Sequence, residues 1–348
     1  MVYIDYRKLI RFSKGSFVVT VPKYWVDKHN LKKGDTISIE EGSNELVFYA
    51  GEKEIKKKEK FISISAEDKK LSMIKAEIVS AYLNNYNTIE IFSKTLEDDA
   101  QVIKGILRNL SGMEIIEQTG KRIVAKDLLD ENSISIQSII RRMDVITRSM
   151  MDDTILCMQG KYSSKSIIHR DIDVNRLYYL GFRMIKNAMD DPMLMNKLKT
   201  NPWRISSDRR ILSRIEEIAD RQKRISRLTG ESEFRGNMLK GFREINEDVK
   251  KVYYDAMKSY YNNDKKMAYE IEIANRGLID RCNKFLEKTS EEICSYCLKE
   301  ANTKSSMKKK DLKLFPSKTI VSASKIAEHI KSTITFIKYI ARTVLSMD

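Results

Sequence analysis

The segment formed by residues 7–50 most constrains the fold, because it carries strand patterns but is too short to bury them. Alternating side chains in residues 16–21 predict a β-strand that ends at Pro22, whose ring offers no N–H to a strand ladder. Helical turns are expected directly after the proline, and residues 36–39 and 46–49 predict two further strands separated by turns. The sequence therefore predicts a small all-β unit with one short helix.

A unit of about forty residues rarely folds alone unless a disulfide, a metal or a partner chain supports it. Residues 7–50 contain no cysteine and no cluster of metal-ligating side chains. We therefore expect two copies of this segment to intertwine as a dimer.

The runs GSFVVTVPKYWV and LKKGDTISI closely resemble the AbrB/MazE/SpoVT swapped-hairpin family, in which two chains interleave β-hairpins and present a basic face to DNA. The resemblance implies that six side chains contact nucleic acid, namely Arg7, Lys8, Arg11, Lys14, Ser16 and Lys23. Arginine and lysine suit this role because they neutralise phosphate charge, and arginine also reaches base edges. The same residues could instead form a solvated edge of a domain used only for pairing.

Composition favours a soluble, helix-rich chain with an anionic partner. The 348 residues suffice for two or three domains, and the formal net charge is +15 with a pI near 9.4. No run approaches the roughly 18 to 20 apolar residues that span a bilayer, and the N-terminus lacks an apolar signal core. We expect a cytoplasmic protein without membrane insertion.

The cysteines fit reduced thiols rather than a disulfide framework. Cys157 and Cys282 stand alone, and Cys294 and Cys297 form a single C-x-x-C on an expected helix. We interpret that pair as structural, and the alternative is that the two thiols have a redox function or bind a metal.

Residues 51–60, GEKEIKKKEK, form a charge run without an apolar stripe, which predicts a linker between a first domain at 1–50 and a second at 61–132. The second domain shows strand and helix patterns in the order β-α-β-α-β-β: strands at 61–64, 88–92, 113–117 and 121–125, helices at 68–83 and 96–110. It has no glycine-rich phosphate loop or catalytic cluster. We expect a small α+β domain that serves packing, dimer support or signal transmission.

From residue 133 onward the pattern changes to long amphipathic helices. Apolar stripes run through residues 134–150, 167–189, 205–228, 238–261, 267–298 and 320–345, with methionines that we interpret as core residues. The expected breaks are Asp190-Asp191-Pro192, Asn201-Pro202, Gly230 and Phe315-Pro316. The fold class is thus multidomain α+β, with a helical domain at 133–348 built from two three-helix repeats at about 133–229 and 238–348.

These two halves resemble the PhoU family of phosphate-uptake regulators. The runs RDIDVNRLY at 170–178 and IEEIAD at 215–220 carry the resemblance, the second being similar to that family's L-E-R-I-x-D. An AbrB-like N-terminus followed by PhoU-like helices is typical of archaeal phosphate-uptake regulator homologues.

Glu216 and Asp220 are four residues apart, so they share one face of a helix. The PhoU resemblance implies that such E-x-x-x-D pairs bind iron or zinc, with Asp171 and Asp173 as helpers. In the second repeat the equivalent positions are Ser324 and Glu328, so one carboxylate is missing. The alternative is that Glu216 and Asp220 form ion pairs with neighbouring arginines.

No Ser-His-Asp order, nucleotide loop or kinase signature is present, and the histidines are scattered, so we expect a regulator rather than an enzyme. The first hypothesis is a homodimeric transcriptional regulator of phosphate uptake and homeostasis. Its helical domain would sense or relay phosphate status, through bound metal or through the ATPase of a phosphate transporter. The alternatives are an adaptor that regulates the transporter without binding DNA and, on the N-terminal fold alone, an antitoxin-like protein.

Overall fold

The computed structural model describes residues 5–41, 45–51, 59–96, 99–129, 134–159, 161, 163–191, 194–195, 198, 200–230, 236–303 and 309–347. The chain divides into two compact units, Met1–Lys58 and Glu59–Asp348.

The first unit contains two short hairpins and one helix. Strand β1 (Ile10–Arg11) pairs antiparallel with β2 (Phe17–Val18), helix α1 (Lys23–Lys28) follows, and β3 (Ile37–Glu41) pairs antiparallel with β4 (Leu46–Ala50). Strand β2 ends three residues before the predicted end, because its partner in this chain is only two residues long. The predicted helical turns and later strands are present.

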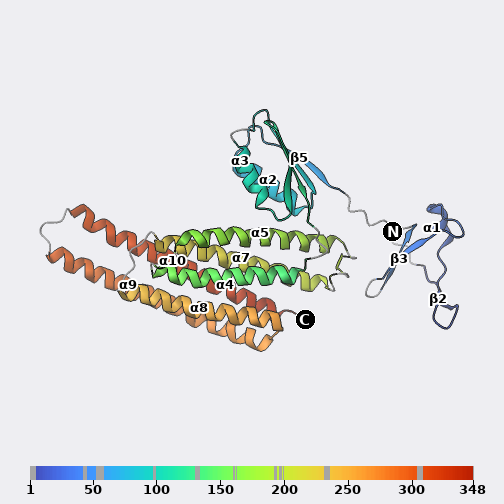
Figure 1. Ribbon diagram of the computed structural model, residues 1–348. Helices are drawn as coiled ribbons and strands as arrows, with labels where there is room; N and C mark the ends of the chain where they lie inside the picture. The colour runs from blue at the N-terminus through green and yellow to red at the C-terminus, as the bar shows by residue number, and fades with distance from the viewer. Residues whose placement is uncertain are drawn as a thin grey trace. The chain divides into compact units, whose positions relative to one another are not determined.

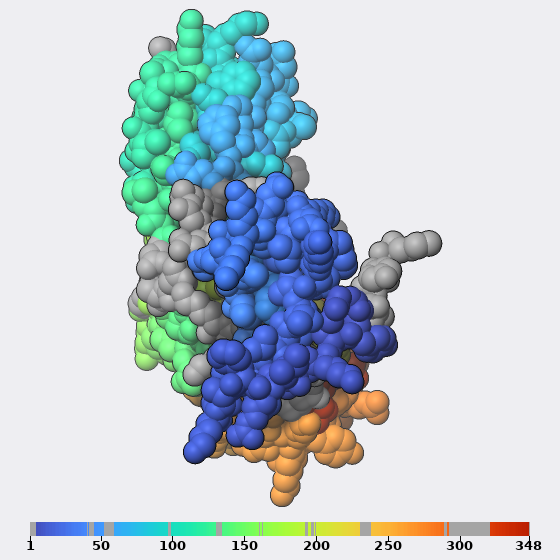
Figure 2. Space-filling model, turned by 90° about the vertical axis from the view of Figure 1, so that its right-hand side faces the viewer, coloured from blue at the N-terminus to red at the C-terminus, as the bar shows by residue number. Residues whose placement is uncertain are grey.

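None of the described residues of this unit is buried. Tyr6, Leu9, Phe12 and Phe17 are 88%, 68%, 80% and 60% exposed. Figure 2 shows the unit in blue as an irregular surface with projecting side chains. Burying apolar surface stabilises a fold by about 25 cal/mol per Å². A single copy of this unit buries too little apolar surface to gain much of this hydrophobic stabilisation.

The second unit begins with the expected α+β domain. Its elements are β5 (Phe61–Ser65), α2 (Leu71–Leu83), β6 (Thr88–Phe92), α3 (Ala100–Arg108), β7 (Met113–Gln118) and β8 (Arg122–Asp127). The sheet order is β5-β6-β8-β7, with β5 parallel to β6 and the other pairs antiparallel. Figure 1 shows α2 and α3 on one face of this sheet, and their core is built from isoleucines and leucines such as Ile74, Ile91 and Leu107.

Six long helices follow among the described residues: α4 (Ile136–Met158), α5 (Ser164–Asp190), α7 (Pro202–Gly230), α8 (Gly236–Asn262), α9 (Lys265–Thr303) and α10 (Lys309–Leu345). Side chains cap the starts of two of these helices. Ser135 accepts from the Ser138 N–H at 3.1 Å, and Asn201 accepts from the Arg204 N–H at 2.7 Å directly before Pro202.

The predicted break at Phe315-Pro316 is wrong. Helix α10 begins at Lys309 and continues through this dipeptide to Leu345. A proline removes one backbone hydrogen bond, and α10 as a whole contacts α9, α7 and α8. The breaks at Asp190 and Asn201-Pro202 are confirmed, since α5 ends at Asp190 and α7 begins at Pro202.

The two helical halves share one hydrophobic core. Helices α4, α5 and α7 pack pairwise, and α8 and α10 join them, because α4 contacts α8 and α7 contacts α10 (Figure 1). Met143, Met150, Met184 and Met257 all lie in this core, which confirms their interpretation as packing residues. Cys157 and Cys282 are buried free thiols, and the side chains of Cys294 and Cys297 lie outside the described residues.

A buried polar joint fastens the α+β domain to the helices. The guanidinium of Arg183 on α5 is 1% exposed, pairs with Asp127, donates from Nε to the Asn85 side-chain oxygen at 2.9 Å and lies 4.7 Å from the centre of the Tyr82 ring. Such a pair specifies geometry more than it adds stability, because each buried charge needs its partner. Helix α2 therefore meets α5 in one defined register.

Gly181 provides a stability test of the helix packing. A Cβ at Gly181 would lie 2.9 Å from a methyl group of Leu212 and 3.3 Å from Ile139, both fully inside the core. We expect Gly181→Ala to lower the free energy of unfolding by about 1 to 3 kcal/mol, because the packed side chains must shift. Gly277→Ala is the matched control, since a Cβ there meets nothing within 4 Å.

Gly277→Ala should instead raise the free energy of unfolding by about 0.5 to 1 kcal/mol, because alanine has a better helix propensity than glycine at an exposed helical position. Urea unfolding followed by circular dichroism measures both variants. Equal effects of the two substitutions would contradict the close approach of α5, α7 and α4.

Candidate functional site: a nucleic-acid interface and a polar network

The six predicted DNA-contact side chains are all exposed. Between Asp5 and Asp27 the sequence has five basic residues and no acidic residue. Among the described residues, Lys8, Lys14 and Lys23 have no acidic partner. A surface with this charge is suited to phosphate contacts, whose affinity comes from counterion release.

A tight hairpin positions part of this set. The Phe12 N–H donates to the Ser16 carbonyl at 3.0 Å, and the Ser13 and Ser16 hydroxyls are 2.7 Å apart. The Arg11 Nε donates to the Ser13 carbonyl at 3.4 Å, so the structure gathers Arg11, Lys14 and Ser16 on one loop. Sequence reasoning missed Ser13, whose hydroxyl also accepts from the Gly15 N–H at 3.3 Å and closes the loop.

Arg7 and Lys8 precede this hairpin, and Lys23 begins α1 after it. Arg7 already has a local partner, because its Nη2 lies 2.5 Å from an Asp5 carboxylate oxygen. An exposed pair of this kind is worth at most about 1 kcal/mol, so a phosphate can replace the carboxylate.

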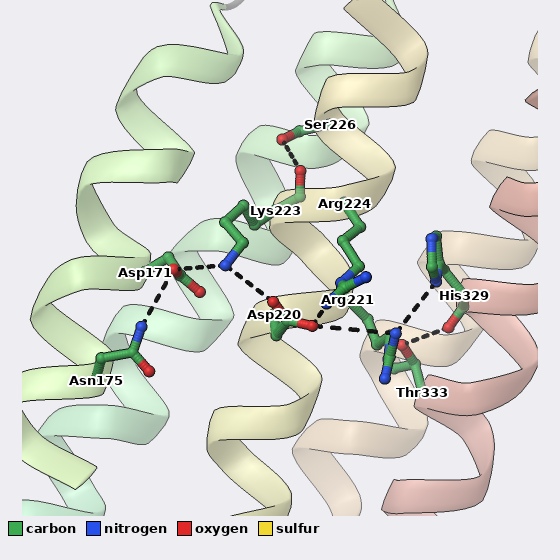
Figure 3. A network of polar contacts seen from close by, with 9 residues as sticks. All are labelled: Asp171, Asn175, Asp220, Arg221, Lys223, Arg224, Ser226, His329 and Thr333. Atoms are coloured by element: carbon green, nitrogen blue, oxygen red, sulfur yellow. Dashed lines mark hydrogen bonds and ion pairs between the residues drawn. The ribbon is translucent and has the colours of Figure 1, made fainter. Parts of the chain in front are cut away.

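A second polar cluster lies between α5, α7 and α10, and Figure 3 shows its core. The Lys223 ammonium bridges two carboxylates, at 2.7 Å from Asp171 Oδ2 and 2.9 Å from Asp220 Oδ1. Asp220 also accepts from Arg224 Nε at 2.7 Å, and Asp171 accepts from the Asn175 amide at 3.2 Å. We call these residues, with Glu216, Arg221 and His329, the α7 network.

Burial sets the protonation of this network. It works against the charged form of Asp220, but hydrogen bonds from Lys223 and Arg224 prevail and lower its pKa. The pKa of Glu216 moves in the opposite direction. Burial, together with the Asp220 and Asp171 carboxylates, outweighs the attraction of the Lys223 charge and raises this pKa to about 7. Burial and the positive charges of Arg221 and Arg224 lower the pKa of His329, which favours the neutral imidazole.

The structure brings together three of the five predicted metal ligands. The Asp171 and Asp220 carboxylates both contribute to raising the pKa of Glu216, whereas Asp173 is exposed and Glu328 pairs with Lys331 at the surface. The Lys223 ammonium stands between Asp171 and Asp220.

Within the part of the chain that the structure describes, no three His, Cys, Asp or Glu side chains are grouped as a metal would require. The Asp171 and Asp220 carboxylates are thus neutralised by the Lys223 ammonium and the Arg224 guanidinium rather than arranged around iron or zinc. Metal binding at these residues stays a prediction. Sequence reasoning missed Lys223, although its spacing of three from Asp220 was a usable signal.

Two buried aspartates connect the helical halves. Asp208 accepts from the Tyr260 hydroxyl at 2.7 Å and from the Gln137 amide at 2.8 Å, and Asp144 accepts from the Tyr261 hydroxyl at 2.9 Å. These bonds join α7 and α4 to α8, so we interpret both aspartates as packing specifiers.

No helix among the described residues is long and apolar enough to cross a membrane.

Comparison with known proteins bears on both ends of the chain. Residues 10–52 match the family model described as antidote-toxin recognition MazE, bacterial antitoxin, which confirms the N-terminal resemblance. No curated protein matches the chain. Among solved structures, the crystal structure of PhoU from Pseudomonas aeruginosa is similar at 14% identity and a TM-score of 0.42, covering 60% of this chain and 95% of that one.

Glu216 predicts a pH dependence of stability in metal-free protein. Its pKa is about 7 in the folded chain, compared with the ordinary value of 4.5 for a glutamate side chain. Between these values the folded chain retains a proton that the unfolded chain has released, so stability falls as the pH rises through this window. We expect Glu216→Gln to be more stable than the parent above pH 7, by up to about 3 kcal/mol, and the advantage to vanish near pH 4.5.

Urea unfolding in the presence of a chelator measures this difference. Glu217→Gln is the control, because Glu217 pairs with Arg214 at 2.5 Å and its loss removes an ion pair instead. A Glu216→Gln stability that parallels the parent at every pH would contradict the assignment.

Proposed function

We propose that this chain is a homodimeric DNA-binding transcriptional regulator of phosphate uptake, without enzymatic activity. One observation carries the DNA-binding part: the N-terminal unit, whose residues 10–52 match the MazE antitoxin family, exposes five basic residues and no acidic one between Asp5 and Asp27. Phosphate contacts from such a surface provide affinity, and arginines such as Arg11 can add base readout.

Dimerisation follows from the apolar surface of the same unit. Leu9, Phe12 and Phe17 are each at least 60% exposed, and none of the described residues of the unit is buried. An exposed apolar surface of this kind marks a protein interface. A second copy of the unit supplies the missing core and places two basic hairpins on one DNA duplex.

The link to phosphate is supported by the sequence resemblance of the helical region to PhoU regulators, at residues 170–178 and 215–220. In this proposal the helices relay phosphate status, through a transporter ATPase or through an effector, to the DNA-binding unit. Such coupling requires that the effector favour one state of the helices, and that this state change the spacing or orientation of the two basic hairpins.

Substitution of the basic hairpin tests DNA binding. The double variant Arg7→Ala with Arg11→Ala should lose promoter affinity, and the slope of log affinity against log salt should fall by about 2 per chain. Lys32→Ala with Lys33→Ala is the control, since it removes the same charge from an exposed turn after α1. Fluorescence anisotropy across a salt series measures both, and parental affinity in the first variant would refute the contact assignment.

Charge inserted into the apolar surface tests dimerisation. We expect Phe17→Asp to shift the protein from dimer to monomer in sedimentation equilibrium, because a buried unpaired carboxylate opposes the interface. Lys33→Asp changes charge at an exposed position and should leave the mass unchanged. A dimer that survives Phe17→Asp would place the interface elsewhere in the chain.

A further inference from the structure

An open groove of about 500 Å³ lies between α2 and α5, where the α+β domain meets the helices. Its α2 wall is a single helical face that includes Ser72, Lys75, Val79 and Ser80. A groove of this size at a junction of structural layers falls within the range of small-molecule sites, about 300 to 1,000 Å³. The sequence patterns gave no sign of it.

The α5 wall provides two aromatic rings and a cation. Tyr179, Phe182 and Lys186 are spaced by three and four residues, so they share one face of that helix. The Arg209 guanidinium of α7 lies 4.8 Å from the centre of the Phe182 ring. This cation–π contact connects the ring to α7.

Charge in the groove has one sign. Lys75 and Lys186 contribute two ammonium groups, and the described lining residues include no carboxylate. Lys186 donates to the side-chain oxygen of Asn84, which is a neutral acceptor, and Lys75 has no acidic partner among the described residues. An anion would gain both ammoniums without displacing a carboxylate.

We propose that this groove binds a nucleotide. The aromatic and apolar side chains of Tyr179, Phe182 and Val79 would accommodate the base, and the two lysines would hold the phosphates. The Ser72 and Ser80 hydroxyls offer hydrogen bonds to a sugar. Inorganic phosphate alone would use the lysines but leave the aromatic wall uncovered.

Two contacts connect this groove to the rest of the molecule. Asn84 and Asn85 end α2 at the polar joint, where Asn85 accepts from Arg183 Nε at 2.9 Å. Burial and then the Glu216 carboxylate of the α7 network raise the pKa of the Tyr179 hydroxyl. A nucleotide between α2 and α5 would thus lie beside the joint, next to Asn84. The proposal stands independently of DNA binding.

The test uses the full chain and the fluorescent analogue N-methylanthraniloyl-ATP, whose emission rises in an apolar site. We expect saturable binding that ATP competes at lower concentration than either inorganic phosphate or adenosine. Lys75→Glu should weaken binding at least about tenfold, a change of about 1.4 kcal/mol. Because Lys75 is exposed, its substitution leaves the fold intact.

Three further variants complete the design. Val79→Trp fills the groove and should abolish binding, whereas the exposed control Lys121→Glu should bind as the parent does. Arg7→Ala with Arg11→Ala should also retain binding, which separates the groove from the basic N-terminal surface. Parental affinity in Lys75→Glu, no saturable binding, or competition by phosphate as effective as by ATP would overturn the proposal.

Discussion

A strand-rich unit of about forty residues cannot bury its own apolar side chains, and this constraint determines how the whole chain must work. Phe12 and Phe17 are exposed in the same short segment as the basic residues. The proposed dimerisation rests on the exposed apolar side chains of this unit, and the proposed DNA binding rests on its basic ones. The helical region has no such need, because its six helices share a continuous core.

Buried polar contacts, rather than the core, give the second unit its defined geometry. Arg183 on α5 pairs with Asp127 at the end of β8 and contacts Tyr82 of α2, and Asp144 and Asp208 connect α8 to α4 and α7. Each contact is costly to break, because a lone buried charge would remain. A rigid joint of this kind is suited to carrying a change in the helices to the α+β domain, and the groove between α2 and α5 lies directly beside it.

The sequence predicted elements well where local pattern decides them. The β-α-β-α-β-β order of residues 61–127 was recoverable because alternation and helical spacing are local properties. Residues 16–21 were predicted as a longer strand than is present, because the length of a strand depends on its partner. The break expected at Phe315-Pro316 is absent, because a proline within a helical pattern marks a boundary that is common but not obligatory.

The sites were less predictable, because they depend on how helices cross. The exposed basic residues could be named from the N-terminal pattern. The Lys223 bridge from Asp220 to Asp171 arises only once α5 packs on α7, and the groove arises from the faces that α2 and α5 turn toward each other. The periodicity of one helix shows which of its faces is apolar, but it does not show which other helix packs against that face.

The most direct test of the account is selection of genomic DNA fragments by the purified parental chain over a series of salt concentrations. Phosphate contacts alone give affinity that decreases steeply and uniformly with salt, whereas a sequence-specific complex retains its fragments longer. The account predicts a salt-resistant set of promoter fragments, each bound by two copies of the chain. Weak binding that disappears uniformly with salt would contradict it, and would leave regulation through protein contacts as the function of the helical region.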